Sequence, residues 1–231
     1  MINKIPFLIL AGGLATRLKP VTNTIPKGML LINNKPFLQH QLELLDSRGV
    51  RKVILCVGHF GKIIEDFFGP KFQNIDIQYS YDGDSLIGTG GAIKKAILNY
   101  NVDVFGVLYG DSYLDINYLD IVTYFLNVNV NGLMTVFKND NLYDKSNVIF
   151  DNRQIIKYDK SSREDMKYID YGFGLYRKHP FITYSDNVFD LSKIIIQLIN
   201  ENQLIGYEVF NRFHEIGSFS GIEEFICALQ R

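Results

Sequence analysis

The chain has 231 residues and a formal net charge of −1, from 24 lysines and arginines against 25 aspartates and glutamates. This balance argues against a nucleic-acid partner, which would need a basic surface. The two cysteines lie far apart in the sequence and exclude a disulfide scaffold, and the N-terminal apolar run is too short for a membrane span or a signal peptide. We therefore expect a reduced, soluble, cytoplasmic protein without a membrane partner.

Strand-like and helix-like patterns alternate through the first half of the chain. Apolar runs predict buried strands at Phe7–Leu10 and Lys52–Val57, and further strands are expected at 75–79, where apolar and polar residues alternate, and at 102–108. Segments with an apolar face, bounded by proline or glycine, predict helices at 36–48, 62–68 and 90–99. This order predicts an α/β fold with a mostly parallel sheet covered by helices on both faces.

The rhythm changes after about residue 130, where strands predominate. Apolar patterns predict strands at 133–137, 148–158 and Tyr168–Arg177, with a hairpin turn at Asp151-Asn152 inside the second of them. Helices are expected at 190–200, with Asp190 as cap, and at 218–229. No linker or repeat interrupts the chain, so we expect one domain over residues 1–231 with a β-rich second half.

The loops after the first-half strands are the expected ligand sites, because ligands in open α/β sheets bind beyond the carboxyl ends of the strands. The first of these loops follows Leu10 and contains Gly12 and Gly13, whose backbone N–H groups can approach an anion closely. Arg17 and Lys27 add cations suited to phosphate oxygens. Neither the dinucleotide fingerprint nor a Walker loop is present, and a plain turn with surface cations is the alternative interpretation.

A second glycine-rich segment, 88–91, precedes a predicted helix. Its glycines could let a nucleobase lie against the backbone, or the segment could be an ordinary helix N-terminus with Thr89 as cap. The local sequence does not decide between these two.

A third candidate is Gly110-Asp111, at the end of the fourth predicted strand. A carboxylate in this place suits Mg²⁺, which takes one or two carboxylates together with phosphate oxygens, although aspartate in a loop is also a common cap or turn residue. Glu215 is the candidate for a second carboxylate.

Taken in order, these segments resemble the sugar-phosphate nucleotidyltransferase family. The short branch of guanylyltransferases acting on D-glycero-α-D-manno-heptose 1-phosphate or mannose 1-phosphate is the most similar. The segments that carry the resemblance are Leu-Ala-Gly-Gly-x-x-Thr-Arg-Leu, Pro26-Lys27, Asn34-Lys35-Pro36-Phe37, Gly88-Thr89-Gly90-Gly91, Gly110-Asp111, Tyr158-Asp159-Lys160, Ile169-Asp170-Tyr171-Gly172 and His214-Glu215-Ile216-Gly217-Ser218.

The resemblance implies a Rossmann-like, mostly parallel mixed sheet with a β-rich sugar-binding part. On this basis residues 1–130 would bind the nucleotide, 131–217 the sugar phosphate, and 218–231 would form a closing helix. The implied reaction joins a nucleoside triphosphate, with GTP favoured, to a heptose or hexose 1-phosphate. It needs Mg²⁺, releases pyrophosphate and gives a nucleotide-sugar for polysaccharide synthesis.

The resemblance also implies roles for single residues. Arg17 would stabilise the leaving pyrophosphate, Lys27 would contact the α-phosphate and the incoming sugar phosphate, and Asp111 would hold Mg²⁺ together with Glu215. Lys160 would contact the sugar phosphate, and Tyr171 and Gly172 the sugar ring. The residues expected to bind the nucleotide are Leu10, Ala11, Gly12, Gly13, Thr16, Gly88 and Thr89.

Three positions depart from the family's usual pattern. Ala15 replaces a glycine, Gly28 follows the lysine in place of proline or alanine, and Glu215 stands where many relatives carry aspartate. None of the three removes a charge that the chemistry needs.

Other functions remain open from the sequence. One is use of a pyrimidine triphosphate or transfer to a non-sugar phosphate. Another is a catalytically silent relative that only binds a nucleotide-sugar, although Arg17, Lys27, Asp111 and Glu215 argue against it. Aromatic side chains on surface helices could form a homodimer interface.

Overall fold

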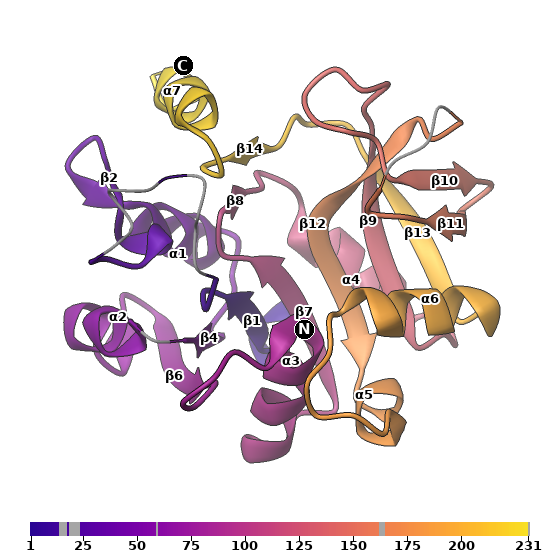
Figure 1. Ribbon diagram of the computed structural model, residues 1–231, viewed down its shortest axis with the longest axis horizontal. Helices are drawn as coiled ribbons and strands as arrows, with labels where there is room; N and C mark the ends of the chain where they lie inside the picture. The colour runs from indigo at the N-terminus through magenta and orange to yellow at the C-terminus, as the bar shows by residue number, and fades with distance from the viewer. Residues whose placement is uncertain (14–17, 19–23, 59, 162–164, 231) are drawn as a thin grey trace.

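A computed structural model of the chain describes residues 1–13, 18, 24–58, 60–161 and 165–230. Its main feature is a ten-stranded mixed sheet that runs through the molecule (Figure 1). In order across the sheet, the strands are β10 (Val148–Asp151), β11 (Gln154–Tyr158), β13 (Leu204–Val209), β9 (Gly132–Lys138), β12 (Tyr168–Arg177), β7 (Val104–Tyr109), β1 (Phe7–Leu10), β4 (Lys52–Val57), β6 (Ile75–Tyr81) and β5 (Lys71–Phe72). The predicted α/β fold class is confirmed.

The strands of the first half form the parallel part of the sheet. β1 pairs in parallel with both β4 and β7, and β4 pairs in parallel with β6. The chain therefore steps from β1 to β4 and β6 on one side, and then returns to place β7 on the other side of β1. This reversal creates a switch point between β1 and β7, and crevices at such points are the usual ligand sites of open α/β sheets.

The central strands read as continuous apolar runs because both of their faces are covered. Phe7 and Ile9 of β1 belong to one core cluster, and Leu8, which points to the opposite face, belongs to another. Alternate residues of a strand point to opposite faces, so a strand buried on both sides needs apolar residues throughout.

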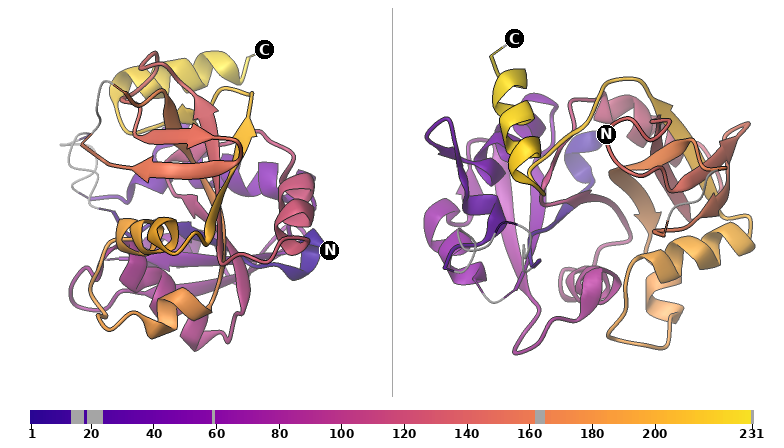
Figure 2. Two further views of the ribbon diagram at one scale, coloured as in Figure 1. Left: turned by 90° about the vertical axis from the view of Figure 1, so that its right-hand side faces the viewer. Right: turned by 45° about the horizontal axis from the view of Figure 1, so that its top comes forward.

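Helices cover the two faces of the sheet. Buried residues of α1 (Phe37–Ser47), α2 (Gly61–Phe68) and α4 (Tyr118–Leu126) contribute to the cluster that contains Phe7. Those of α3 (Gly88–Asn99), α5 (His179–Thr183) and α6 (Ser192–Asn200) contribute to the cluster that contains Leu8. The last helix, α7 (Phe219–Ala228), lies on the opposite side of the molecule from α5 and α6 (Figure 2).

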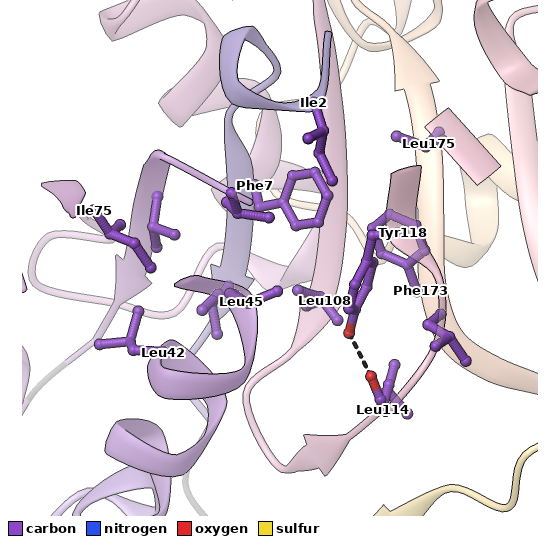
Figure 3. Close-up of a cluster of buried hydrophobic side chains, with 14 of the residues drawn as sticks. Ile2, Phe7, Leu42, Leu45, Ile75, Leu108, Leu114, Tyr118, Phe173 and Leu175 are labelled. Carbon is purple, nitrogen blue, oxygen red and sulfur yellow. Dashed lines mark hydrogen bonds between the residues drawn. The ribbon is translucent and has the colours of Figure 1, made fainter. Parts of the chain in front are cut away.

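The cluster around Phe7 joins the two halves of the sheet (Figure 3). The Phe7 ring lies 5.5 Å from the ring of Tyr118 and 5.2 Å from that of Phe173 on β12. The Tyr118 hydroxyl donates a 2.8 Å hydrogen bond to the Leu114 carbonyl, drawn as a dashed line in Figure 3. α4, which supplies Tyr118, was not predicted.

The second half is β-rich, as expected, and continues the same sheet. β12 pairs antiparallel with β7 and with β9, whereas β13 pairs parallel with β9. The predicted hairpin forms between β10 and β11, but its turn lies one residue later than predicted. Asn152 and Arg153 are the turn residues, with φ of 46° and 66°, because a tight hairpin needs positive φ at both central positions.

Several other boundaries differ from the predictions. α3 begins at Gly88 rather than at residue 90, α6 begins at Ser192 rather than at 190, and β6 continues to Tyr81 rather than ending at 79. The unpredicted β13 completes the sheet. Short elements complete the described structure: the 3₁₀ turns Ile2–Lys4 and Lys27–Met29, the pair β2 (Leu31–Ile32) and β3 (Lys35–Pro36), and the pair β8 (Ser112–Tyr113) and β14 (His214–Glu215).

Within the residues that the structure describes, none of the helices combines the length and the apolar character that a membrane crossing requires.

Candidate functional site

A cavity of about 440 Å³ opens at the carboxyl ends of β1, β4, β6 and β7. It lies where the switch point predicts a ligand site, and eight of the residues predicted to act in catalysis, metal binding or nucleotide binding line it. These are Leu10, Ala11, Gly12, Gly13, Lys27, Gly88, Thr89 and Asp111. The sheet thus brings together segments that are far apart in the chain.

An ion pair between Lys27 and Asp111 is the main charged feature of the cavity. The Lys27 Nζ lies 2.7 Å from Asp111 Oδ2, and the two side chains are 15% and 34% exposed. The backbone of Asp111 is fixed separately, because its carbonyl accepts a 2.9 Å hydrogen bond from the Ile216 N–H. A cation and a carboxylate in contact, both facing the cavity, are suited to bind phosphate oxygens and a divalent metal, respectively.

In the turn after β1, the glycines Gly12 and Gly13 line the cavity with main-chain atoms, because they have no side chains. A side chain at Gly12 would begin 3.2 Å from the carboxylate of Asp82 and 3.2 Å from the backbone nitrogen of Gly58. On the β7 side, a Cβ at Gly110 would lie 2.5 Å from the Leu10 carbonyl oxygen, so this position requires glycine. The close approach of these backbones shapes the floor of the cavity at the β1/β7 switch point.

The glycine-rich start of α3 has a structural reason that the sequence did not show. The backbone N–H groups of Gly90 and Gly91 both donate to the Phe189 carbonyl, at 2.9 and 3.1 Å. Gly88 has φ of +76°, and a Cβ there would lie 2.4 Å from the same carbonyl oxygen. Thr89 does not cap the helix; its hydroxyl accepts a 2.8 Å hydrogen bond from the Leu191 N–H. These residues therefore dock the segment before α6, and Gly88 and Thr89 also line the cavity.

Asp82 is a cavity residue that the sequence reasoning missed. It follows β6 directly, and its backbone is held by a 2.9 Å hydrogen bond from its N–H to the Val57 carbonyl. Burial raises the pKa of the Asp82 carboxyl, while the positive charge of Lys95 lowers it. The signal that could have found this residue is the strand alternation, which continues to Tyr81 and thereby places Asp82 at the edge of the sheet.

Lys160 and Asp190 form a second ion pair at the margin of the cavity. Lys160 Nζ contacts both carboxylate oxygens of Asp190, at 2.8 and 2.9 Å, and Asp190 itself lines the cavity. Burial raises the pKa of Asp190, but the hydrogen bonds from Lys160 and Ser192 outweigh this and lower it to about 2. Asp190 is therefore ionised at neutral pH and holds Lys160 beside the cavity.

The predicted sugar residues Tyr171 and Gly172 have different surroundings. The Tyr171 ring is 2% exposed and packs in the core against Phe137 and Phe213, so its side chain does not reach the cavity. The N–H of Gly172 donates to Asp170, whose carboxylate also accepts a 3.3 Å hydrogen bond from the hydroxyl of the cavity residue Tyr109. Burial raises the pKa of Asp170 to about 6, against the lowering effect of these hydrogen bonds.

Glu215 lies next to the Asp111 loop through its backbone. It pairs with Ser112 in the β8–β14 ladder, but its carboxylate accepts a 2.8 Å hydrogen bond from the Gly217 N–H and lies beside Gly221 at the start of α7. Gly217, not Glu215, lines the cavity. A role of Glu215 as second metal ligand stays a prediction.

Residues 14–17 of the predicted phosphate loop lie outside the described residues, and they include Ala15 and the predicted site residues Thr16 and Arg17.

The donor set of the cavity fits Mg²⁺ bound with a triphosphate. In the described ranges, no group of three or more histidine, cysteine, aspartate or glutamate side chains forms a ready metal cage. Mg²⁺ is commonly held by one or two carboxylates and by substrate phosphates, and Asp111 provides such a carboxylate on the cavity wall.

The cavity lies at the switch point of an α/β sheet, which is the usual place for a ligand in this class of fold. The nucleotidyl transferase family model matches residues 7–147, and the chain belongs to this family. The resemblance inferred from the motifs is thereby confirmed.

Two curated relatives are D-glycero-alpha-D-manno-heptose 1-phosphate guanylyltransferases. The protein from Campylobacter jejuni is 43% identical over 110 residues, which are 48% of this chain and 49% of the relative. The protein from Aneurinibacillus thermoaerophilus is 41% identical over 105 residues, which are 46% of this chain and 45% of the relative. The matched part thus spans about half the length of these relatives.

Among solved structures, HddC from Yersinia pseudotuberculosis complexed with GMP-PN is similar over nearly the whole chain. The TM-score is 0.80, with 24% identity, and the match covers 98% of this chain and 100% of the other. At this identity the likeness shows the fold.

Proposed function

We propose that this protein is a nucleotidyltransferase that joins GTP to a sugar 1-phosphate, with D-glycero-α-D-manno-heptose 1-phosphate as the favoured acceptor. The observation that carries the proposal is the cavity at the β1/β7 switch point, in which the Lys27–Asp111 pair faces the glycine-rich turn. Family membership and the similarity to two heptose 1-phosphate guanylyltransferases support it.

The proposed reaction is a direct displacement at the α-phosphorus of the triphosphate. A phosphate oxygen of the sugar 1-phosphate forms the new P–O bond, and the bond to the β-phosphate breaks, so that pyrophosphate leaves with the electron pair. The attacking phosphate is already ionised at neutral pH, and no general base is required. Catalysis of such a reaction comes mainly from positioning the reactants and neutralising their negative charge. Lys27 supplies a cation on the cavity wall that could do both.

Mg²⁺ is the proposed cofactor, with Asp111 as its protein ligand and Glu215 as the second predicted one. The bound ion would supply positive charge at the phosphate oxygens. In the structure, the Asp111 carboxylate contacts the Lys27 ammonium. When the metal and the triphosphate bind, Asp111 would contact the metal and Lys27 would contact the phosphate oxygens.

Asp82 supports guanine as the base. Guanine presents two adjacent donors, N1–H and N2–H₂, on one edge, and a carboxylate offers two acceptor oxygens and no donor. On the corresponding edge, adenine and cytosine present one donor group, the exocyclic amine, next to ring or carbonyl acceptors, and uracil and thymine present N3–H between two carbonyl acceptors. None of these edges offers two adjacent donor groups to a carboxylate. Asp82 is half-buried in the cavity wall beside Gly12 and Leu86, so an unpaired charge there would be unfavourable.

The sugar end is proposed to lie toward Lys160, Asp190 and Asp170. Lys160 forms an ion pair with the cavity residue Asp190, which supports its proposed contact with the sugar phosphate. The Tyr109–Asp170–Gly172 hydrogen bonds provide polar groups near the same wall, suited to sugar hydroxyls.

Pyrophosphate release tests the proposal. The purified protein is incubated with Mg²⁺ and with every combination of ATP, GTP, CTP, UTP or dTTP and heptose, mannose or glucose 1-phosphate. We expect the highest kcat/KM with GTP and the heptose phosphate. A clear preference for another triphosphate would contradict the assignment of guanine, and release with none of the combinations would contradict the enzymatic function.

A further inference from the structure

A buried glutamine reaches from α1 to the loop that carries Asp111. The Gln41 Nε2 donates to the carbonyl of Tyr109 at 3.0 Å and to the carbonyl of Ser112 at 2.6 Å. These two carbonyls stand directly before and after Gly110–Asp111. Gln41 is 4% exposed and lies 68 and 71 positions away from its two partners in the sequence. One side-chain nitrogen thus bridges the two ends of the dipeptide.

Packing alone does not account for a glutamine at this place. Both protons of its amide nitrogen are used, but the buried Oε1 has no hydrogen-bond partner in the part of the chain that the structure describes. A buried acceptor without a partner is unfavourable, and methionine would fill a similar volume without it. The feature that only the amide provides is a pair of donors from one atom, directed at two converging carbonyls.

The remaining backbone groups of the loop are held from other directions. The Gly110 N–H donates to the Leu10 carbonyl at 3.1 Å, and the Asp111 carbonyl accepts from the Ile216 N–H at 2.9 Å. With Gln41 on the third side, the main chain around Asp111 is fixed by β1, α1 and the β14 segment. The direction of the Asp111 carboxylate, toward Lys27 and the cavity, follows from this fixed backbone.

The same helix also supports the other member of the ion pair. The Phe37 N–H, at the start of α1, donates to the Leu30 carbonyl at 2.9 Å. The position of a Cβ on Gly28, next to Lys27, is 3.4 Å from the Leu38 Cβ. α1 therefore contacts the segments of both Lys27 and Asp111, and it sets their relative placement.

We propose that Gln41 is a positioning residue for the metal–nucleotide complex: by clamping the carbonyls on either side of Gly110–Asp111, it orients the Asp111 carboxylate for a divalent cation bound with a nucleoside triphosphate. This inference rests on the proposed function. It predicts that loss of the two Gln41 hydrogen bonds weakens the metal-dependent part of nucleotide binding and leaves the metal-independent part intact.

The test compares GTP affinity with Mg²⁺ and with EDTA, by calorimetry and without any sugar phosphate. Gln41→Met removes both donors at similar volume. Gln39→Met is the matched control, because Gln39 lies on the same helix and its amide donates to Glu43 instead of the loop. Gln41→Glu keeps the size and polarity of the native side chain but cannot donate two hydrogen bonds, and it covers the case in which methionine disturbs the folding of α1.

In the wild type and in Gln39→Met, we expect Mg²⁺ to strengthen GTP binding by the same factor. In Gln41→Met and Gln41→Glu, we expect this factor to fall at least tenfold while the affinity in EDTA stays within about twofold. An unchanged factor in both Gln41 variants would overturn the positioning role and leave the proposed function standing. Failure of the wild type to bind GTP under either condition would overturn the proposed function, and this inference with it.

Discussion

Lys27 and Asp111 form a contact that their local sequences do not reveal. They are 84 positions apart, and the order of the strands brings them to 2.7 Å. Partly exposed ion pairs contribute only about 0–1 kcal/mol to stability, so the fold does not depend on this one. In the proposed mechanism, the cation and the carboxylate each have a separate role, at the phosphates and at the metal.

Replacement of Lys27 by methionine tests the charge without a large change in volume. We expect kcat for pyrophosphate release to fall by about 10²- to 10³-fold, as for the loss of one preorganised group at a developing charge, with the melting temperature nearly unchanged. Lys35→Met is the control, because Lys35 forms a comparable 3.0 Å pair with Glu43 on the surface. Wild-type kcat in Lys27→Met would remove Lys27 from the proposed mechanism.

Asp82 carries the prediction for base selection. In Asp82→Asn one of the two acceptor oxygens becomes a donor, so we expect kcat/KM with GTP to fall about 10- to 100-fold, the cost of one mismatched hydrogen bond in a buried site. The preference for GTP over UTP should shrink by the same factor. The neighbouring exposed Asp84, changed to asparagine, should alter neither value. Retained GTP preference in Asp82→Asn would show that another group reads the base.

At the scale of elements, the parallel half of the sheet was predictable and parts of the second half were not. β1 and β4 are apolar runs whose burial on both faces can be read directly from the sequence. α4 was missed although its buried residues Tyr118, Ile121, Val122 and Phe125 have helical spacing, because the exposed Leu119 blurs the periodicity. The hairpin turn was displaced because its positive φ values fall on Asn152 and Arg153.

Long-range packing explains the elements and site residues that sequence patterns did not give. Gly206 interrupts the apolar pattern of β13, and the structure shows the reason, since a Cβ there would lie 2.4 Å from the Phe150 ring. Ending the third strand at 79 hid Asp82 from the predicted site. Gln41 has no sequence signal at all, because its hydrogen bonds are to two carbonyls about 70 residues away.

The hydrogen bond that anchors α4 gives a prediction at this scale. Tyr118→Phe removes the 2.8 Å hydrogen bond to the Leu114 carbonyl, which keeps a 3.1 Å bond from the Ile116 N–H, so we expect the free energy of unfolding to fall by about 1 kcal/mol. Urea denaturation measures this difference. Tyr124→Phe on the same helix should cost less than about 0.5 kcal/mol, because the contact of the Tyr124 hydroxyl with Arg153 is long (3.4 Å) and exposed. Equal losses in the two variants would contradict the anchoring role.

At the scale of the whole molecule, Asp170 links stability to pH. Its pKa is about 6 in the folded protein, against an ordinary value of 3.8. Between these values the folded state keeps a proton that the unfolded state has lost, so the free energy of unfolding decreases as the pH rises through this window. Two pKa units correspond to at most about 3 kcal/mol.

Asp170→Asn should remove this dependence. Measured by urea denaturation between pH 4 and pH 7, the stability of the variant should gain on the wild type as the pH rises, by up to about 3 kcal/mol. As a control, the exposed Asp76 is changed to asparagine, and the free energy of unfolding of this variant should change with pH in parallel with that of the wild type. A parallel curve for Asp170→Asn as well would show that Asp170 titrates normally.

Binding of the whole protein to a nucleoside triphosphate is the central claim, and thermal unfolding with Mg²⁺ and each of ATP, GTP, CTP, UTP and dTTP tests it most directly. A ligand at about 100 times its dissociation constant stabilises the folded state by about 2.7 kcal/mol, which gives a measurable rise in melting temperature. We predict the largest rise with GTP. Equal rises with all five would contradict a base-reading cavity, and no rise with any of them would contradict the assignment of the cavity as a triphosphate site.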